Sequence, residues 1–303
     1  MKDSLGDRIK SYEKMYSPKV FPLLPVIARL DGRCFSNWTK GLSRPFDHDM
    51  MDIMQGTTKE LVHLSGALLG YTQSDEITLV FYSDDPKSQV FFDGKVQKMC
   101  SVLASMCTAE FAECLNNLLG NACEENNHHS NEVIFKLGNK PPATFDCRIF
   151  QVPTLEEVVN CLIWREQDAV RNSILAVGQS KFSHQEMHNK SCAEVQEMLF
   201  QAHDINWGED FSNSEKRGTY FRRVKTMRPF TFAEIQNLPP KHEARTNPSL
   251  IIERHDIKEM NYPILTKIEN RVDVIFNGAE PILKSDKNPT ELESDIGDNN
   301  ESV

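Results

Sequence analysis

The sequence predicts an α+β fold: a ferredoxin-like βαββαβ sheet with helices on one face, followed by a mostly helical C-terminal half. Three observations support this prediction. Within residues 1–153, four short β-prone runs alternate with two longer stretches of helical periodicity. Their order is strand, helix, strand, strand, helix and strand, which is the split βαβ arrangement. From residue 154 onward, apolar residues recur mostly at helical spacing.

The first strand and the helix after it have clear boundaries. Residues 25–30 form a short β-prone run that ends abruptly at Asp31-Gly32, which predicts a buried strand followed by a turn. From Asp47 or His48, apolar residues up to Leu64 recur at helical spacing. This pattern predicts a helix that packs by one face.

A hairpin with an acidic tip is predicted next. Residues 67–71 and 77–82 are β-prone and flank the short polar stretch Thr72–Glu76. Residues 95–119 then place apolar side chains along one face of a long helix, and residues 143–152 alternate like a strand. Between these last two elements, residues 116–132 are rich in Asn, Glu and His and lack apolar periodicity, which indicates a surface insertion.

The second region is expected to span residues 154–284. Thr154–Glu157 matches a capping box and begins a helix that reaches about residue 176. Residues 183–201 predict another helix, and residues 271–276 a late strand. Residues 285–303 have few apolar and many acidic side chains, so we expect an acidic disordered tail.

Composition narrows the function classes. The net charge of −10 argues against a non-specific nucleic-acid binder, because that activity depends on neutralising phosphates. Positive charge is nevertheless concentrated in the basic segment 216–228, which contains no acidic side chain. No apolar stretch approaches the ~20 residues of a membrane span. The eight cysteines form no CxxC pair, so we expect a protein of a reducing, cytoplasmic compartment.

Two aspartates provide the main chemical prediction. The topology places Asp31 at the end of the first strand and Asp75 at the tip of the neighbouring hairpin, so their carboxylates should lie side by side. Such a pair can hold two Mg²⁺ ions ~3.5–4 Å apart, which suits phosphoryl transfer. Mg²⁺ takes few ligands from protein, so a backbone carbonyl such as that of Gly32 would complete the set. The alternative is that both aspartates are ordinary turn residues.

Several segments resemble the tRNA-histidine guanylyltransferase superfamily. They are Arg29–Arg33 (RLDGR), Arg44–Asp47 (RPFD), Gly70–Glu76 (GYTQSDE), Phe92–Lys98 (FDGKVQK), Ala143–Arg148 (ATFDCR), Trp164–Asp168 (WREQD) and Lys216–Thr219 (KRGT). Their order and spacing also agree, from about Leu5 to Ile282, when the insertion and the acidic tail are omitted. The resemblance implies a polymerase- or cyclase-like palm for residues 1–153 and a nucleotidyltransferase activity.

The resemblance also implies roles for individual residues. It assigns metal binding to Asp31, Asp75 and the Gly32 carbonyl, with Glu76 as a further catalytic carboxylate. It assigns nucleotide binding to Gly32, Arg33, Cys34, Phe35, Ser36, Arg44, Ser74, Lys95 and Lys98. Many members carry histidine in place of Ser36 and lysine in place of Arg44. In the basic segment, the expected tRNA contacts are Lys216, Arg217, Arg222, Arg223 and Lys225, although a solvated surface is the alternative.

One departure from the family pattern distinguishes two branches. The segment HINNLYN of eukaryotic guanylyltransferases is replaced by Val170–Ala176 (VRNSILA), and this change and the opening Leu5–Glu13 resemble the guanylyltransferase-like branch. That branch implies an enzyme that adds template-chosen nucleotides in the 3′–5′ direction to tRNA 5′ ends, as repair, and the family resemblance implies a homotetramer. ATP would activate 5′-monophosphate ends, and GTP or another NTP would be added. The alternatives are a tRNA-histidine-specific guanylyltransferase, a nucleotidyl cyclase and a non-catalytic tRNA-binding protein.

Overall fold

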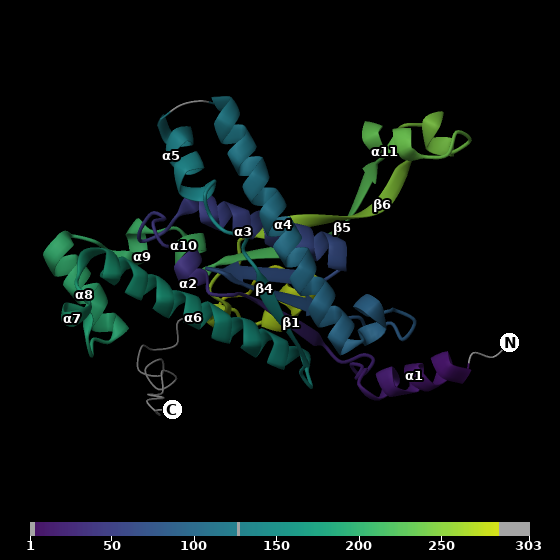
Figure 1. Ribbon diagram of the computed structural model, residues 1–303, viewed down its shortest axis with the longest axis horizontal. Helices are drawn as coiled ribbons and strands as arrows, with labels where there is room; N and C mark the ends of the chain where they lie inside the picture. The colour runs from purple at the N-terminus through teal and green to yellow at the C-terminus, as the bar shows by residue number, and fades with distance from the viewer. Residues whose placement is uncertain (1–3, 126–127, 285–303) are drawn as a thin grey trace. The chain divides into compact units, whose positions relative to one another are not determined.

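The centre of the fold is a six-stranded sheet in which neighbouring strands run antiparallel, in the order β4-β1-β3-β2-β5-β6. This computed structural model describes residues 4–125 and 128–284 (Figure 1). The strands are β1 Val26–Gly32, β2 Leu69–Gln73, β3 Glu76–Phe81, β4 Phe145–Gln151, β5 Thr219–Pro229 and β6 Ile251–Met260. Among the described residues, no helix is both long enough and apolar enough to cross a membrane.

Helices account for most of the remaining regular structure. They are α1 Ser4–Met15, α2 Phe35–Trp38, α3 His48–Ser65, α4 Val96–Glu125, α5 His128–Leu137, α6 Leu155–Lys181, α7 His184–Met187, α8 Cys192–His203, α9 Trp207–Asp210, α10 Asn213–Arg217 and α11 Phe232–Asn237. The chain divides into two compact units, Met1–Asn261 and Tyr262–Val303. The sheet and these helices all belong to the first unit.

One face of the sheet forms the main core with α3 and α4. Side chains alternate along a strand, and Val26, Ala28 and Leu30 of β1 are fully buried in the same cluster as residues of both helices. Helix α3 begins after Asp47, whose carboxylate accepts the N–H of Met50 as an N-cap. The four strands and two helices predicted for the first half are therefore confirmed.

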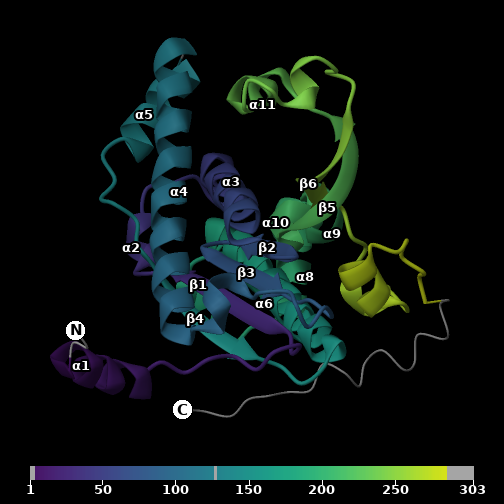
Figure 2. The same cartoon turned by 90° about the vertical axis from the view of Figure 1, so that its right-hand side faces the viewer.

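The opposite face of the sheet is covered by α6. Arg29, which alternates with the core residues of β1, lies with its guanidinium 5.5 Å from the ring centre of Trp164 on α6. Arg165 of the same helix pairs with Glu76 of β3. Figure 2 shows α6 on the other side of the strands from α3 and α4. This helix begins at the predicted capping residue, Thr154, whose side chain accepts the N–H of Glu157.

The second half contributes strands to the sheet as well as helices. β5 pairs with β2 through residues 219–222 and then continues with β6 as a two-stranded arm that carries α11 at its far end (Figure 2). The compact unit accordingly extends to Asn261, beyond the boundary expected at residue 153. The reason is strand pairing across a long sequence separation, which local periodicity does not reveal.

Three local expectations have different outcomes. The strand predicted at residues 271–276 is wrong, because Asp273–Asn277 forms a helical turn that buries Val274 and Ile275. Within the expected insertion 116–132, helix α4 continues to Glu125 and buries Ala122, so much of this segment extends the long helix. The acidic tail 285–303 lies outside the described residues.

Candidate active site

The end of β1 meets the tip of the β2–β3 hairpin. Asp31 is paired in register with Glu76 of β3 and with Asp146 of β4, and the N–H of Gly32 donates to the Asp75 carbonyl over 3.2 Å. Asp75 and Ser74 form the two-residue turn, in which Ser74 has a φ of 51°. The structure thus brings Asp31 and Asp75 together and adds Asp146, which the sequence did not single out.

The negative charges of the neighbouring carboxylates repel one another, which makes each carboxyl group harder to ionise. Burial raises the pKa of Asp75 to about 6, and the charges of Asp31 and Glu76 add to this effect. Burial also raises the pKa of Asp31, with further contributions from Glu76 and Asp146. The guanidinium of Arg148, 3.6 Å from a carboxylate oxygen of Asp31, offsets part of the repulsion. The area therefore favours a bound cation.

The donor atoms suit a hard divalent cation such as Mg²⁺. Such ions prefer carboxylate and carbonyl oxygens and retain several waters. In the described ranges, no group of three or more His, Cys, Asp or Glu side chains is arranged to hold a metal ion. The groups at this junction that could hold such an ion are the Asp31 and Asp75 carboxylates and the Gly32 carbonyl, with water or substrate as further ligands.

A pH dependence of stability follows for the cation-free protein. The pKa of Asp75 in the folded chain, about 6, lies above the ordinary value of 3.8, so its contribution to stability is greatest below pH 4. It declines as the pH rises through 6, by about 3 kcal/mol at most. Denaturant unfolding in EDTA should show Asp75→Asn gaining stability relative to the parent between pH 4 and 7. A constant difference between the two proteins would contradict this assignment.

The carboxylate of Glu76 contacts three side chains within the fold. Its carboxylate accepts from Arg165 at 2.6 Å and from the Gln73 side chain at 2.9 Å, and lies 3.5 Å from Arg29. These contacts fix the start of β3, directly after Asp75. These contacts let Glu76 position the hairpin tip, and its role as a further catalytic carboxylate stays a prediction.

The turn after β1 places several backbone N–H groups beside this tip. Cys34 has a left-handed φ of 56° and precedes the short helix α2, while Phe35 is buried against Trp38, Phe111 and Phe145. The N–H of Arg33 donates to Thr144. Within the described part of the chain, the N–H groups of Cys34, Phe35 and Ser36 meet no acceptor. Free N–H groups at a helix start can receive phosphate oxygens.

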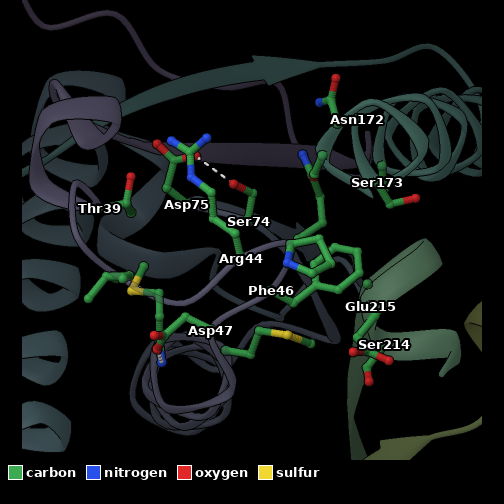
Figure 3. A pocket seen from close by; sticks show the side chains of 18 of the residues that line it. Thr39, Arg44, Phe46, Asp47, Ser74, Asp75, Asn172, Ser173, Ser214 and Glu215 are labelled. Carbon is green, nitrogen blue, oxygen red and sulfur yellow. Dashed lines mark hydrogen bonds between the residues drawn. The ribbon is translucent and has the colours of Figure 1, made fainter. Parts of the chain in front are cut away.

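A cavity of about 270 Å³ opens next to Asp75 (Figure 3). Ser74, Asp75 and Arg44 lie at one end, and Asn172 and Ser173 of α6 at the other. Its lining includes Phe35, Thr39, Leu42, Ser43, Arg44, Phe46, Asp47, Met50, Ser74, Asp75, Ala169, Asn172, Ser173, Ala176, Ser214 and Glu215. Mostly apolar walls with a few polar groups are typical of a small-molecule site. Phosphate groups held at the turn could therefore belong to a ligand whose base lies in this cavity.

The comparisons with known proteins agree with this geometry. The family model described as tRNAHis guanylyltransferase (Thg1) matches residues 6–153. A bacterial tRNA(His) guanylyltransferase (Thg1)-like protein, solved in complex with ATP, is 32% identical and superposes with a TM-score of 0.69, covering 90% of this chain and 99% of the other. The chain belongs to the tRNAHis guanylyltransferase family. Members of this family are nucleotidyltransferases.

Three other proteins extend the comparison. An uncharacterized protein, R259, of Acanthamoeba polyphaga mimivirus is 36% identical over 57% of this chain, and the chain spans 61% of that protein's length. A probable tRNA(His) guanylyltransferase of Dictyostelium discoideum is 23% identical over 74% of this chain and 84% of its own. The tRNA(His) guanylyltransferase of Saccharomyces cerevisiae, 20% identical over 75% of this chain and 99% of its own, shares the fold with a TM-score of 0.55.

Two lysines implied by the family resemblance lie elsewhere. Lys95 and Lys98 line a separate cavity of about 660 Å³, together with Phe81 at the end of β3 and Arg223 of β5. Asp75 precedes the opposite end of β3, roughly 20 Å from Phe81 along the strand. The structure therefore does not bring Lys95 and Lys98 to the Asp75 cavity, because they line a cavity at the opposite end of β3.

The basic segment is only partly accessible. Lys216 is buried and its ammonium donates to the Gly208 carbonyl at 2.6 Å, and Arg222 is buried on β5. Lys225 is exposed but lies 3.2 Å from Glu253 of β6. Strand alternation and acidic neighbours thus divide the segment, so the prediction of tRNA contacts is corrected for Lys216 and Arg222. It stays a prediction for Arg217, Arg223 and Lys225.

Sequence reasoning missed the far wall of the cavity. Phe46 and Asp47 were noted as part of a motif, but Asn172, Ser173, Ser214 and Glu215 were not assigned to a site. Asn172 and Ser173 lie in Val170–Ala176, the segment that departs from the eukaryotic pattern. That departure was the available signal, since a branch-specific segment is a reasonable candidate for ligand contact.

Proposed function

We propose that this protein is a template-dependent 3′–5′ nucleotidyltransferase that repairs tRNA 5′ ends. The central observation is the juxtaposition of Asp31 and Asp75 beside a cavity lined by Ser74 and Arg44. The bacterial relatives solved with ATP and with GTP support nucleoside triphosphates as substrates. A cyclase would use the same carboxylates but would need no RNA partner.

Different residues of this chain would bind the metal ions, the phosphate oxygens and the base. Asp31, Asp75 and the Gly32 carbonyl would hold two Mg²⁺ ions, which when bound stabilise charge on the attacking and leaving oxygens. The unpaired N–H groups of residues 34–36 and the Arg44 guanidinium would receive phosphate oxygens, and the cavity between α3 and α6 would hold a base. Glu76 keeps the Asp75 turn in place through Arg165.

Two displacements account for the reaction. An oxygen of the RNA 5′-monophosphate first attacks the α-phosphorus of ATP, and pyrophosphate leaves. The 3′-hydroxyl of the incoming NTP then attacks the 5′-phosphorus of the RNA, loses its proton and expels AMP. An RNA that already bears a 5′-triphosphate needs no activation, and the second displacement then releases pyrophosphate.

The repair activity is favoured over histidine-tRNA guanylation by the segment Val170–Ala176. This segment departs from the eukaryotic pattern, and Asn172, Ser173 and Ala176 within it line the Asp75 cavity. A change in side chains that line the nucleotide cavity can alter which nucleotide the enzyme accepts. In a repair enzyme, base pairing with the opposite strand chooses the added nucleotide, so the protein needs to hold only the shape and phosphates of the RNA.

A substrate comparison tests the repair activity. A 5′-triphosphorylated non-histidine tRNA lacking its first nucleotide should be extended by the complementary nucleotide at least as efficiently as full-length tRNA-histidine receives an extra guanylate. The ratio of kcat/KM for the two RNAs is the measurement, and cyclic nucleotide formation should be undetectable. Strong preference for tRNA-histidine that disappears when its anticodon is changed would favour the guanylyltransferase alternative.

Filling the cavity should separate nucleotide binding from RNA binding. Ala176→Phe places a ring in a cavity of about 270 Å³ and should raise the KM for the NTP roughly tenfold while leaving RNA affinity unchanged. Ala202→Phe, at an exposed position of α8, is the matched control. An unchanged NTP KM in Ala176→Phe would mean that the base lies elsewhere.

Two further expectations belong to the same proposal. The family resemblance implies a homotetramer, which sedimentation at assay concentration would test. The cytoplasmic location expected from cysteine usage stays a prediction.

A further inference from the structure

Trp164 is a large apolar side chain that the fold leaves exposed. Its exposed fraction is 49%, whereas Trp38 and Trp207 are exposed by 5% and 8%. Trp164 lies on α6 with the guanidinium of Arg165 3.7 Å and that of Arg29 5.5 Å from its ring centre. Trp164, Arg29 and Arg165 together form what we call the Trp164 platform.

The platform is held rigidly to the active-site hairpin. Arg165 is buried and donates to Glu76 at 2.6 Å, and Arg29 lies 3.5 Å from the same carboxylate. Glu76 directly follows Asp75 in the chain. An indole held against two paired guanidinium groups presents a pre-oriented aromatic surface at little cost in side-chain entropy.

The platform also lies next to Asp31. Arg29 is two residues before Asp31 on the same strand and the same face, roughly 7 Å away along β1. On the neighbouring strand β4, this face carries Asp146, Arg148 and Phe150, all exposed. Arg148 reaches to 3.6 Å from the Asp31 carboxylate. An exposed aromatic ring and a solvent-accessible cation thus flank Asp31 on the β4 side of the sheet.

The cavity beside Asp75 is separate from the Trp164 platform. Its lining comes from residues 35–51, the hairpin residues 73–75, the later residues of α6 and residues 214–218, and Trp164, Arg29 and Arg148 are not among them. An in-line displacement needs the attacking and leaving groups on opposite sides of the phosphorus. If the base of the NTP occupies the cavity, the acceptor RNA approaches Asp31 and Asp75 from the side of the sheet that carries β4.

We infer that the Trp164 platform stacks a base at the 5′ end of the acceptor RNA, and that Arg148 contacts its terminal phosphate. This inference rests on the proposed function for the identity of the partner. Base stacking on an aromatic ring tolerates any sequence, as a repair enzyme requires. Arg148 lies beside Asp31, and its guanidinium is suited to contact an RNA phosphate once a Mg²⁺ ion compensates the charge of Asp31.

Fluorescence tests the inference on the unmodified protein. Because the other two tryptophans are buried, acrylamide should quench mainly Trp164. A 5′-truncated tRNA should protect this emission from quenching, whereas ATP or GTP alone should not. Absence of protection by RNA at saturating concentration overturns the inference, and equal protection by ATP alone reassigns the platform to the nucleotide and also overturns it.

Kinetics provide the second readout. Trp164→Ala should raise the KM for RNA at least ~5-fold, the lower end of what one stacked base contributes, with the NTP KM within about 2-fold of the parent. Trp164→Phe should restore most of the affinity, and Phe200→Ala, a helical aromatic of similar exposure, should have no effect. Equal RNA KM values for the parent and Trp164→Ala contradict the inference.

The two proposals can fail separately. A parent protein that adds no nucleotide to any RNA defeats the proposed function, while quenching still decides whether RNA covers Trp164. A parent that adds nucleotides but whose Trp164 stays equally accessible when RNA is bound retains the function and loses the platform.

Discussion

Replacing Asp75 or Asp31 by asparagine is expected to lower nucleotide addition by at least ~10³-fold while leaving the fold intact. Each change keeps the size of the side chain but removes a charged oxygen ligand at the β1–hairpin junction. Without this ligand, the transition state loses several kcal/mol of stabilisation at its attacking and leaving oxygens. A loss of that size lowers the rate by about this factor. Single-turnover rates on 5′-triphosphorylated RNA in saturating Mg²⁺ give the measurement.

Stability separates this loss from misfolding. Asp75 is costly to ionise in the folded chain, so Asp75→Asn should unfold at the same or higher denaturant concentration than the parent at pH 7.5 in EDTA. Asp84→Asn, an exposed carboxylate in the segment after β3, should retain full activity as the matched control. Near-normal rates for Asp31→Asn or Asp75→Asn would remove the basis of the two-metal assignment.

Replacing Arg165 by methionine is expected to destabilise the protein by about 3–5 kcal/mol and to lower activity through the hairpin. Removing one partner of a buried ion pair costs the other charge most of its compensation, because the remaining cation near Glu76, Arg29, lies farther away at 3.5 Å. Arg165 is buried, and its guanidinium also lies 3.3 Å from Asp168, so two carboxylates lose a partner. Urea unfolding at pH 7.5 gives the stability difference, and the rate at saturating substrate gives the effect on activity.

A double-mutant cycle assigns the effect to the Glu76 contact. Glu76→Gln with Arg165→Met should be less destabilised than the sum of the two single variants, because the lone carboxylate charge is gone. Arg171→Met, which removes the exposed partner of Asp168, is the matched control and should cost less than about 1 kcal/mol. Additive losses in the cycle would show that Arg165 and Glu76 act independently.

The sequence alone was sufficient to predict which end of the sheet carries Asp31 and Asp75. The β-prone run before Asp31 and the polar stretch between two strands at Thr72–Glu76 are local signals, and both formed the elements they predicted. A hairpin necessarily places its tip beside the end of the adjacent strand. The approach of Asp31 and Asp75 therefore followed from short-range patterns and a common topology.

The roles of the charged residues were decided by the tertiary structure. Glu76 and Asp75 are neighbours in sequence, yet only strand alternation and the arrival of α6 direct Glu76 to Arg165. Lys216 and Arg222 belong to a run of positive charge, but packing buried both while Lys225 stayed exposed. The residue type sets the sign of a charge. Whether that charge can contact a partner depends on which face of its helix or strand is covered by the rest of the fold.

The cavity beside Asp75 and the Trp164 platform also depended on the tertiary structure. Both lie where α6 meets segments far away in the sequence, and helical periodicity fixes only which side chains share a face, not what that face meets. The sequence by itself determined the palm and its two aspartates, because these rest on local pattern and strand order. The remaining site was decided by long-range packing, which joins residues 35–51, 73–75, 169–176 and 214–218 around one ligand-sized space.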